Sequence, residues 1–201
     1  MKRLLMGLAP GLALCTLVLG QDDPQKPFQQ YFANGGTVRL MLASGDYTVR
    51  AGTSDRIFVS WKAENSRYTR DMKNIRVKAA ALAGNAATIR TEGPAKHARV
   101  TIEVPPKTNL YLRMRAGDVK IEGIEGDKDI HMTAGDLTIE VAPAAYSSVH
   151  ASVKVGDLKA RPLGISKDGL GNSFRWSGAG KYKLDATLFA GDLTLSQPAV
   201  R

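Results

Sequence analysis

From residue 36 onward, apolar and polar residues alternate along most of the chain instead of recurring at helical spacing. Every second residue is apolar in the clearest segments, which are 100–104, 110–114, 119–122, 137–141 and 193–195. A period of two places the apolar side chains on one face of a strand and the polar ones on the other. The pattern therefore predicts an all-β protein, in which only residues 62–73 are suited to a short helix.

The dipeptide Gly-Asp recurs along the chain and spaces the predicted strands. It occurs at Gly45-Asp46, Gly117-Asp118, Gly126-Asp127, Gly135-Asp136, Gly156-Asp157 and Gly191-Asp192. From Gly45 to Gly117, Gly135, Gly156 and Gly191, the successive intervals are 72, 18, 21 and 35 residues, close to multiples of 18. Gly126 lies nine residues after Gly117, which corresponds to half a turn. A short recurring period is typical of solenoids, whose coils bury their apolar faces against one another. We expect a single-domain right-handed β-helix with coils of about 18 residues, and an antiparallel β-sandwich is the alternative.

Glycine and aspartate each have a physical role at the corner of such a coil. A tight corner needs a residue with positive φ, which glycine adopts without steric cost. The aspartate that follows can accept a hydrogen bond from a nearby backbone N–H group. We therefore interpret the Gly-Asp pairs as structural turns. The paired glycines of calcium-binding repeats are missing from "AGDLTIEVA", so we expect no metal and expect lysines (Lys120, Lys154 or Lys159) to offset the stacked carboxylates.

The first twenty residues differ in character from the rest of the chain. Lys2 and Arg3 precede an uncharged apolar run over residues 4–19, and Gly20 ends it. This layout predicts a secretory signal peptide over residues 1–20, because the run is shorter than a membrane-spanning helix. No other stretch is apolar enough to span a membrane, so we expect no transmembrane segment in the mature chain. Residues 21–35 are predicted to be a linker and residues 36–201 the folded domain.

The chain carries few residues suited to catalysis. Cys15 is the only cysteine and lies in the predicted signal peptide, so the exported chain would have neither a disulfide nor a thiolate. The histidines, His97, His131 and His150, have no metal-binding spacing and follow no nucleophile motif. We therefore expect no enzyme and no cofactor. A polysaccharide-active enzyme such as a lyase is the alternative, since basic side chains are available.

The net charge is +9, from 28 basic and 19 acidic residues. The basic residues are scattered, among them Arg90, Arg113 and Arg115, which indicates solvated strand faces. An exported protein meets anionic envelope components more readily than nucleic acid, so we expect no nucleic-acid partner. Phe174, Arg175 and Trp176 stand in a glycine-rich excursion between coils and are possible partner-binding residues. The alternative is that the two aromatic residues cover the end of the core.

Two segments resemble a known family. "VTIEVPPKTNLYLRMRAGDVKIEGIEGDKDIHMTAGDLTIE", residues 100–140, is similar to the bacterial putative-adhesin family of β-strand repeat proteins, catalogued as a domain of unknown function. "GKYKLDATLFAGDLTLSQ", residues 180–197, resembles its closing coil. The family has serine before Gly-Asp, which only Ser44 retains here. The resemblance implies an exported, β-helical, non-catalytic adhesin or scaffold, in the periplasm or at the cell surface, that binds an envelope protein or a glycan.

Overall fold

The computed structural model describes residues 27–82, 85–93 and 95–198, so the predicted signal peptide lies outside the described residues. Within these ranges the protein is all-β, as predicted, and contains no α-helix. Residues 62–73, suited to a short helix, contain two 3-10 turns at Ser66–Tyr68 and Asp71–Asn74. Two further 3-10 turns lie at Pro143–Ala145 and Arg161–Leu163.

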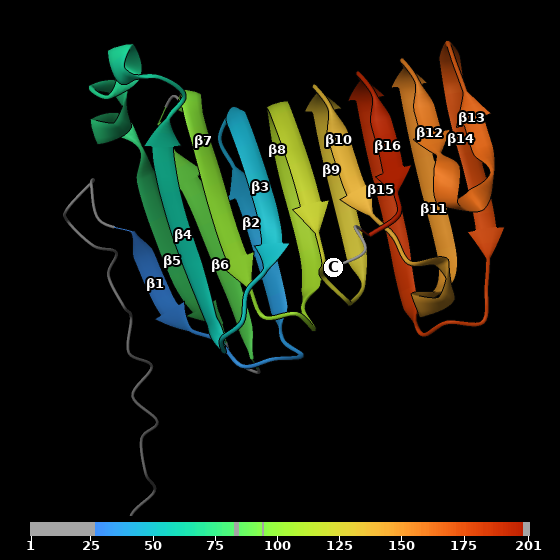
Figure 1. The fold of residues 1–201 in the computed structure, drawn as a ribbon, viewed down its shortest axis with the longest axis horizontal. Coiled ribbons are helices and arrows are strands. Elements are labelled where there is room, and N and C mark those ends of the chain that lie inside the picture. Colours follow the sequence, from blue (N-terminus) through green and yellow to red (C-terminus); the bar gives the residue numbers. More distant parts are fainter. Residues whose placement is uncertain (1–26, 83–84, 94, 199–201) are drawn as a thin grey trace, which may run out of the picture.

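The strands form two open sheets, which Figure 1 shows as two layers of strands. Sheet A consists, in spatial order, of β1 (Phe28–Tyr31), β4 (Arg56–Ala63), β7 (Ala95–Val104), β3 (Gly45–Ala51), the second half of β8 (Asn109–Glu122), β10 (Leu137–Glu140), β16 (Leu193–Ser196), β12 (Leu158–Ala160) and β13 (Ile165–Lys167). Sheet B consists of β5 (Arg76–Leu82), β6 (Ala86–Glu92), β2 (Thr37–Leu42), the first half of β8, β9 (Lys128–Ala134), β15 (Tyr182–Ala190), β11 (Tyr146–Val155) and β14 (Leu170–Ser177). The two sheets are continuous through β8, the longest strand.

Strand pairing is parallel inside both sheets and antiparallel only toward their ends. The inner strands of sheet A pair in parallel, as do those of sheet B. The antiparallel pairs all involve β1, β4, β5, β13 or β14. The sheets therefore have parallel interiors and antiparallel pairs at their ends.

The spatial order of the strands is not their order in the sequence. Gly45 on β3 is paired directly with Gly117 on β8, and β16 lies between β10 and β12. Our interpretation of the 72-residue and 35-residue intervals as four turns and two turns is therefore wrong, because residues at both separations are nearest neighbours. The residues within these long intervals include the end strands β4 and β5 in the first case and β13 and β14 in the second. After them, the chain forms a strand that pairs with one formed earlier in the sequence. The 18-residue spacing is found where β8 pairs with β9 and with β10, as in Leu110 with Lys128 and Val119 with Leu137.

Glycines stack on one another where the chain passes from sheet B to sheet A. The φ angles of Gly117, Gly135, Gly191 and Gly156 are +126°, +112°, +127° and +130°. A Cβ atom on Gly135 would overlap the carbonyl oxygen of Gly117, and one on Gly191 would overlap that of Gly135. Glycine is needed here for two reasons, the backbone angle and the close approach of the next strand.

The aspartates beside these glycines form a ladder of hydrogen bonds between strands. In each step the Oδ1 atom of one aspartate accepts the backbone N–H of the next, in the order Asp118, Asp136, Asp192 and Asp157, with N–O distances of 3.0, 3.3 and 3.2 Å. At the opposite corner, the N–H of Asp127 donates to Asn109 and that of Lys183 donates to Asp127. The side chains thus satisfy the backbone of the neighbouring strand rather than of their own turn.

Of the three lysines expected to offset the charge of these carboxylates, only one lies beside an aspartate of the column. Lys159 lies 2.8 Å from Asp157, whereas Lys120 pairs with Glu122 and Lys154 lies beside Phe189 on sheet B. Burial, and next the charge of Asp118, raise the pKa of Asp46 at the end of the column. The remaining carboxylates are exposed or half-buried, so water screens their repulsion.

The core lies between the sheets and is built from the alternating apolar positions. Parallel pairing aligns equivalent residues, so that Val119, Leu137, Leu193 and Leu158 form one buried row across sheet A. Each fully buried side chain of this size contributes about 1.5–3 kcal/mol relative to exposure. The core also extends into the predicted linker. Residues 28–31 form β1, and Phe28 and Phe32 are buried, so the boundary at residue 35 is wrong.

One charged residue, Lys128, occupies an inward position of this core with only 2% of its surface exposed. Its Nζ atom donates to the carbonyl oxygens of Ile124 and Gly126 and to the hydroxyl of Tyr146. Burial lowers the pKa of Lys128 to about 8, although the carboxylates of Asp127 and Glu125 partly oppose the shift.

The glycine column predicts a difference between two glycines with similar backbone angles. Gly135→Ala should destabilise the protein by more than about 1 kcal/mol, since the new Cβ meets the Gly117 carbonyl as well as an unfavourable φ. Gly169, with a φ of +102° and no neighbouring atom within 4 Å, is the matched control and carries only the backbone strain. Denaturant melts of Gly135→Ala and Gly169→Ala measure the difference, and equal losses would contradict the close stacking.

The lowered pKa of Lys128 predicts that the protein becomes more stable as the pH rises above 8. The folded pKa of about 8 lies below the ordinary value of 10.5, so between these values the unfolded chain holds a proton that the folded chain has released. The free energy of unfolding should therefore increase by about 1.5 kcal/mol from pH 8 to about pH 9.5, below the titration of ordinary tyrosine. Denaturant melts of the wild type and of Lys128→Met at both pH values test this. The variant should lose the rise, and an identical rise in both proteins would show that it has another source.

Candidate ligand-binding face on sheet B

The outward side chains of sheet B form rows that cross the strands, because parallel register places equivalent residues side by side. One row, which we call the polar row, consists of Arg39, Tyr111, Asp129, Asp185, His150 and Arg175. The next row toward the Gly-Asp corners consists of Arg90, Met41, Arg113, His131, Thr187, Ser152 and Ser173. Residues as far apart in the sequence as Arg39 and Arg175 thus lie on one surface.

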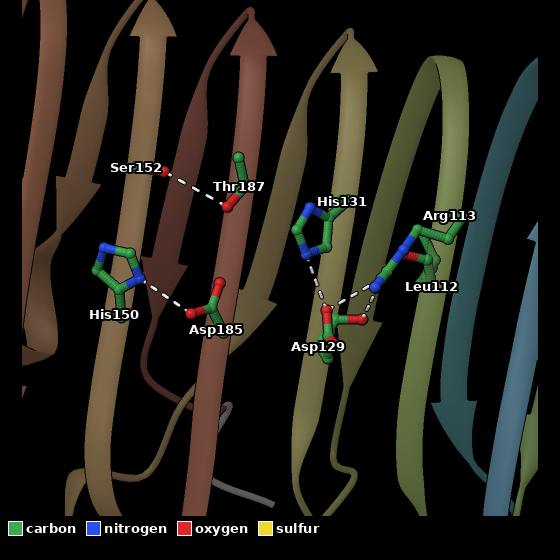
Figure 2. A network of polar contacts seen from close by, with 8 residues as sticks. All are labelled: Leu112, Arg113, Asp129, His131, His150, Ser152, Asp185 and Thr187. Atoms are coloured by element: carbon green, nitrogen blue, oxygen red, sulfur yellow. Dashed lines mark hydrogen bonds and ion pairs between the residues drawn. The ribbon is translucent and has the colours of Figure 1, made fainter.

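Acidic and basic side chains of these rows pair both within one strand and between adjacent strands, as Figure 2 shows. Asp129 Oδ1 lies 3.0 Å from both Arg113 Nη1 and His131 Nε2. On the neighbouring strands, His150 Nδ1 is 2.9 Å from Asp185 Oδ2. These contacts fix the two imidazole rings and one guanidinium group on the surface. These side chains are half-buried or exposed, but the shared Oδ1 atom of Asp129 is itself buried, and its two close contacts are ion pairs without hydrogen-bond geometry.

A pocket of about 440 Å³ lies over the polar row, lined in part by Tyr111, Asp129, His131, His150 and Asp185. Histidines and carboxylates at hydrogen-bonding distance are the groups that general acid–base chemistry uses. Tyr111 is less available, because the guanidinium carbon of Arg39 lies 5.1 Å from its ring centroid.

A larger groove of about 1040 Å³ runs beside this pocket along the ends of seven strands of sheet B, from β6 to β14. We call it the sheet B groove. The residues that line it include the basic side chains Arg90, Arg113, Arg115, His131 and Lys154, the apolar side chains Met41 and Phe189, and the hydroxyl groups of Thr133, Ser152, Ser173 and Thr187. Phe189 is 52% exposed and Met41 is 39% exposed, which is unusual for side chains of their size in a regular sheet.

The charges of the groove are only partly balanced. Glu92 is the only carboxylate among the lining residues, and it pairs with Lys78 at 2.8 Å. Arg113 pairs with Asp129, as described above. Within the described ranges no carboxylate lies within 4.0 Å of Arg90, Arg115 or Lys154. Lys154 Nζ lies 5.6 Å from the ring centroid of Phe189. The groove therefore carries excess positive charge.

The residues predicted as partner-binding lie outside this groove. The glycine-rich segment that contains these residues forms the two strands β13 and β14 rather than a loop. β14 pairs with β11, and β13 pairs with β12. Phe174 is buried in the core, Arg175 is exposed in the polar row, and Trp176 is half-buried beside Gly178. Phe174 therefore fits the alternative in which the aromatic residues cover the core. Trp176 is only half-buried and still exposes part of its surface.

Sequence reasoning missed the groove because its residues come from separate strands. Arg90 and Arg115 were expected to be solvated charges, and Lys154 was expected near the aspartates. One signal was available for the His131 pair, since Asp129 precedes it by two residues and shares its strand face. The pairing of His150 with Asp185 spans 35 residues and requires the register of β11 against β15.

The described ranges contain neither a cluster of metal-ligating side chains nor a membrane-spanning helix. No group of three or more His, Cys, Asp or Glu side chains there is arranged to hold a metal ion. No helix of this part of the chain has the length and apolar character needed to cross a membrane.

Comparisons with known proteins show the fold. A "putative cell adhesion protein" from Clostridium sporogenes is similar over 86% of this chain and 99% of its own, with a TM-score of 0.53 and 13% identity. A "putative adhesin" from Bacteroides fragilis (85% of this chain, 96% of its own, TM-score 0.25, 10% identity) and a "putative lipid binding protein" from Parabacteroides distasonis (86%, 96%, 0.21, 7%) have scores too low to support an argument. No protein-family model matches the chain, and no curated protein matches it significantly.

Proposed function

We propose that this protein is an exported, non-catalytic β-solenoid of the putative-adhesin type that binds an envelope or cell-surface protein or glycan in the sheet B groove. The groove carries the proposal, because it has a volume of about 1040 Å³ and combines exposed apolar side chains with cations that have no carboxylate nearby in the described ranges. Ligand sites are concave and pair apolar contact with a few polar groups.

Three observations support the solenoid assignment. Parallel strands of both sheets are joined at Gly-Asp corners, the corner glycines stack, and aspartates connect successive strands. The chain also shares its fold with the "putative cell adhesion protein" of Clostridium sporogenes, which supports the adhesin-type part of the proposal. The spatial order of the coils departs from the sequence order, so this solenoid has coils inserted between earlier ones.

Export is supported by the sequence. Residues 1–20 have the layout of a secretory signal, and the remaining chain contains no cysteine. We accordingly place the protein in the periplasm or at the cell surface.

An enzyme acting on polysaccharide is a second candidate, favoured by one specific observation. Tyr111, Asp129, His131, His150 and Asp185 converge on the pocket beside the groove. Paired carboxylate and imidazole groups next to a polymer-sized groove would suit acid–base chemistry on a bound chain.

The binding proposal predicts that a bulky side chain in the groove abolishes envelope association. Thr187→Trp should fill the middle of the groove and reduce co-sedimentation with the envelope fraction of the host by at least about tenfold, corresponding to about 1.4 kcal/mol. Thr194→Trp is the matched control, because Thr194 is also a half-buried outward threonine but lies on β16 of sheet A.

Equal binding by Thr187→Trp and the wild type would contradict the groove as the binding site. The variant Trp176→Ala tests the other possible binding site, which is at β14. If it alone loses association while its melting curve stays close to that of the wild type, the partner binds at β14, as the sequence suggested.

The two candidate functions differ in their products. Incubation with acidic polysaccharide should release neither reducing ends nor unsaturated uronate, whether the wild type or His150→Ala is used. Release by the wild type that His150→Ala reduces about a hundredfold, the size typical of a lost acid–base group, would establish the enzyme instead.

A further inference from the structure

We infer that the sheet B groove takes a linear acidic glycan, laid across the strands, with Arg90, Arg115 and Lys154 contacting successive acidic groups. This inference rests on the proposed function and names the chemical class of the ligand. It follows from the number, the pairing and the spacing of the cations that line the groove.

The unpaired cations make an anionic ligand favourable. Three basic side chains line the groove without a carboxylate within 4.0 Å in the described ranges, and Glu92 is already engaged by Lys78. A groove lined by charges of one sign concentrates ligands of the opposite sign and accelerates their association. Neither a neutral nor a cationic ligand would use this arrangement.

The spacing of the cations favours a polymer over a small anion. Arg90 lies on β6, Arg115 on β8 and Lys154 on β11. These strands are separated by two and three strand spacings, so the cations stand about 10 Å and about 14 Å apart, measured across the sheet. A single phosphate or lipid headgroup can contact one of them at a time. A chain with acidic groups at intervals can contact all three.

The surface between the cations suits a sugar better than an acyl chain. Thr133 and Thr187 lie on the two strands between Arg115 and Lys154, Ser152 lies on the same strand as Lys154, and all three carry hydroxyl groups. Hydroxyl groups can donate and accept, as the hydroxyls of a glycan require. Exposed apolar contact is limited to Met41 and Phe189, and Phe189 can stack against a sugar ring.

The aromatic content also favours a glycan over single-stranded nucleic acid. Nucleic acid without sequence preference is bound by several aromatic side chains on which successive bases stack. Phe189 is the only aromatic residue among those that line the groove. The groove thus offers electrostatic contacts along its length but no series of stacking platforms.

The test is binding of the purified protein to polygalacturonate and to heparin, with neutral dextran, phosphatidylglycerol vesicles and oligo-dT as competing classes. The variant carries Arg90→Gln, Arg115→Gln and Lys154→Gln. Its matched control carries Lys62→Gln, Arg67→Gln and Arg70→Gln, which remove the same charge from exposed positions outside the groove. Affinity is measured as a function of salt concentration, and melting curves verify that both variants are folded.

We expect an acidic glycan to bind the wild type, the groove variant to bind at least about tenfold more weakly, and the control to bind within about twofold. Each ionic contact contributes about 0.7 to the slope of log affinity against log salt for a single-stranded polyanion, so the groove variant should lose about 2. Use of both polymers distinguishes carboxylate from sulfate as the recognised group.

Three results would overturn the inference. Equal losses in the groove variant and the control would mean attraction by net charge alone, and stronger binding of dextran, vesicles or oligo-dT would name another class of ligand. Loss of envelope association in Thr187→Trp but not in the groove variant would refute the acidic glycan and leave the proposed function intact. If neither variant lost envelope association, the groove itself would be excluded.

Discussion

The close approach of backbones at the Gly-Asp corners is the constraint on which the rest of this structure depends. At Gly135 and Gly191 a side chain would overlap the carbonyl oxygen of the preceding glycine, so neighbouring strands meet at a fixed residue. The aspartate that follows then binds the backbone of the next strand. Register is therefore set at the corner, and a shift of one residue would turn every apolar side chain away from the core.

The candidate site is a consequence of this register. The same alignment that stacks Leu137 on Leu193 inside the core also places His150 beside Asp185 on the outer face. Rows of outward side chains cross the strands at a regular interval, and the groove collects cations from β6, β8 and β11 without any loop dedicated to binding. Regular parallel pairing thus gives this protein a surface of the length and periodicity that a polymer requires.

Local features of this fold could be predicted from the sequence, whereas its spatial order could not. Alternation predicted the strands, and the glycines at 117, 135, 156 and 191 do adopt positive φ, as a corner requires. The interval of 72 residues between Gly45 and Gly117 is equally compatible with four turns and with direct pairing, and only long-range packing decides between them. The same limitation concealed the groove, because its cations come onto one surface only through the spatial order of the strands. Phe28 was missed since the prolines and polar residues around it are typical of a linker.

Disulfide trapping of neighbouring strands tests the spatial order of the strands most directly. Thr138 on β10 is the lateral partner of Thr194 on β16, whereas Lys159 on β12 lies one strand further away. In a chain whose Cys15 is replaced by alanine, Thr138→Cys with Thr194→Cys should oxidise readily, because adjacent strands bring Cα atoms within the 4.4–6.8 Å or so that a disulfide spans. Thr138→Cys with Lys159→Cys should remain reduced. The reverse result would mean that β10 is adjacent to β12, and it would contradict the strand order from which both the groove and its proposed ligand are derived.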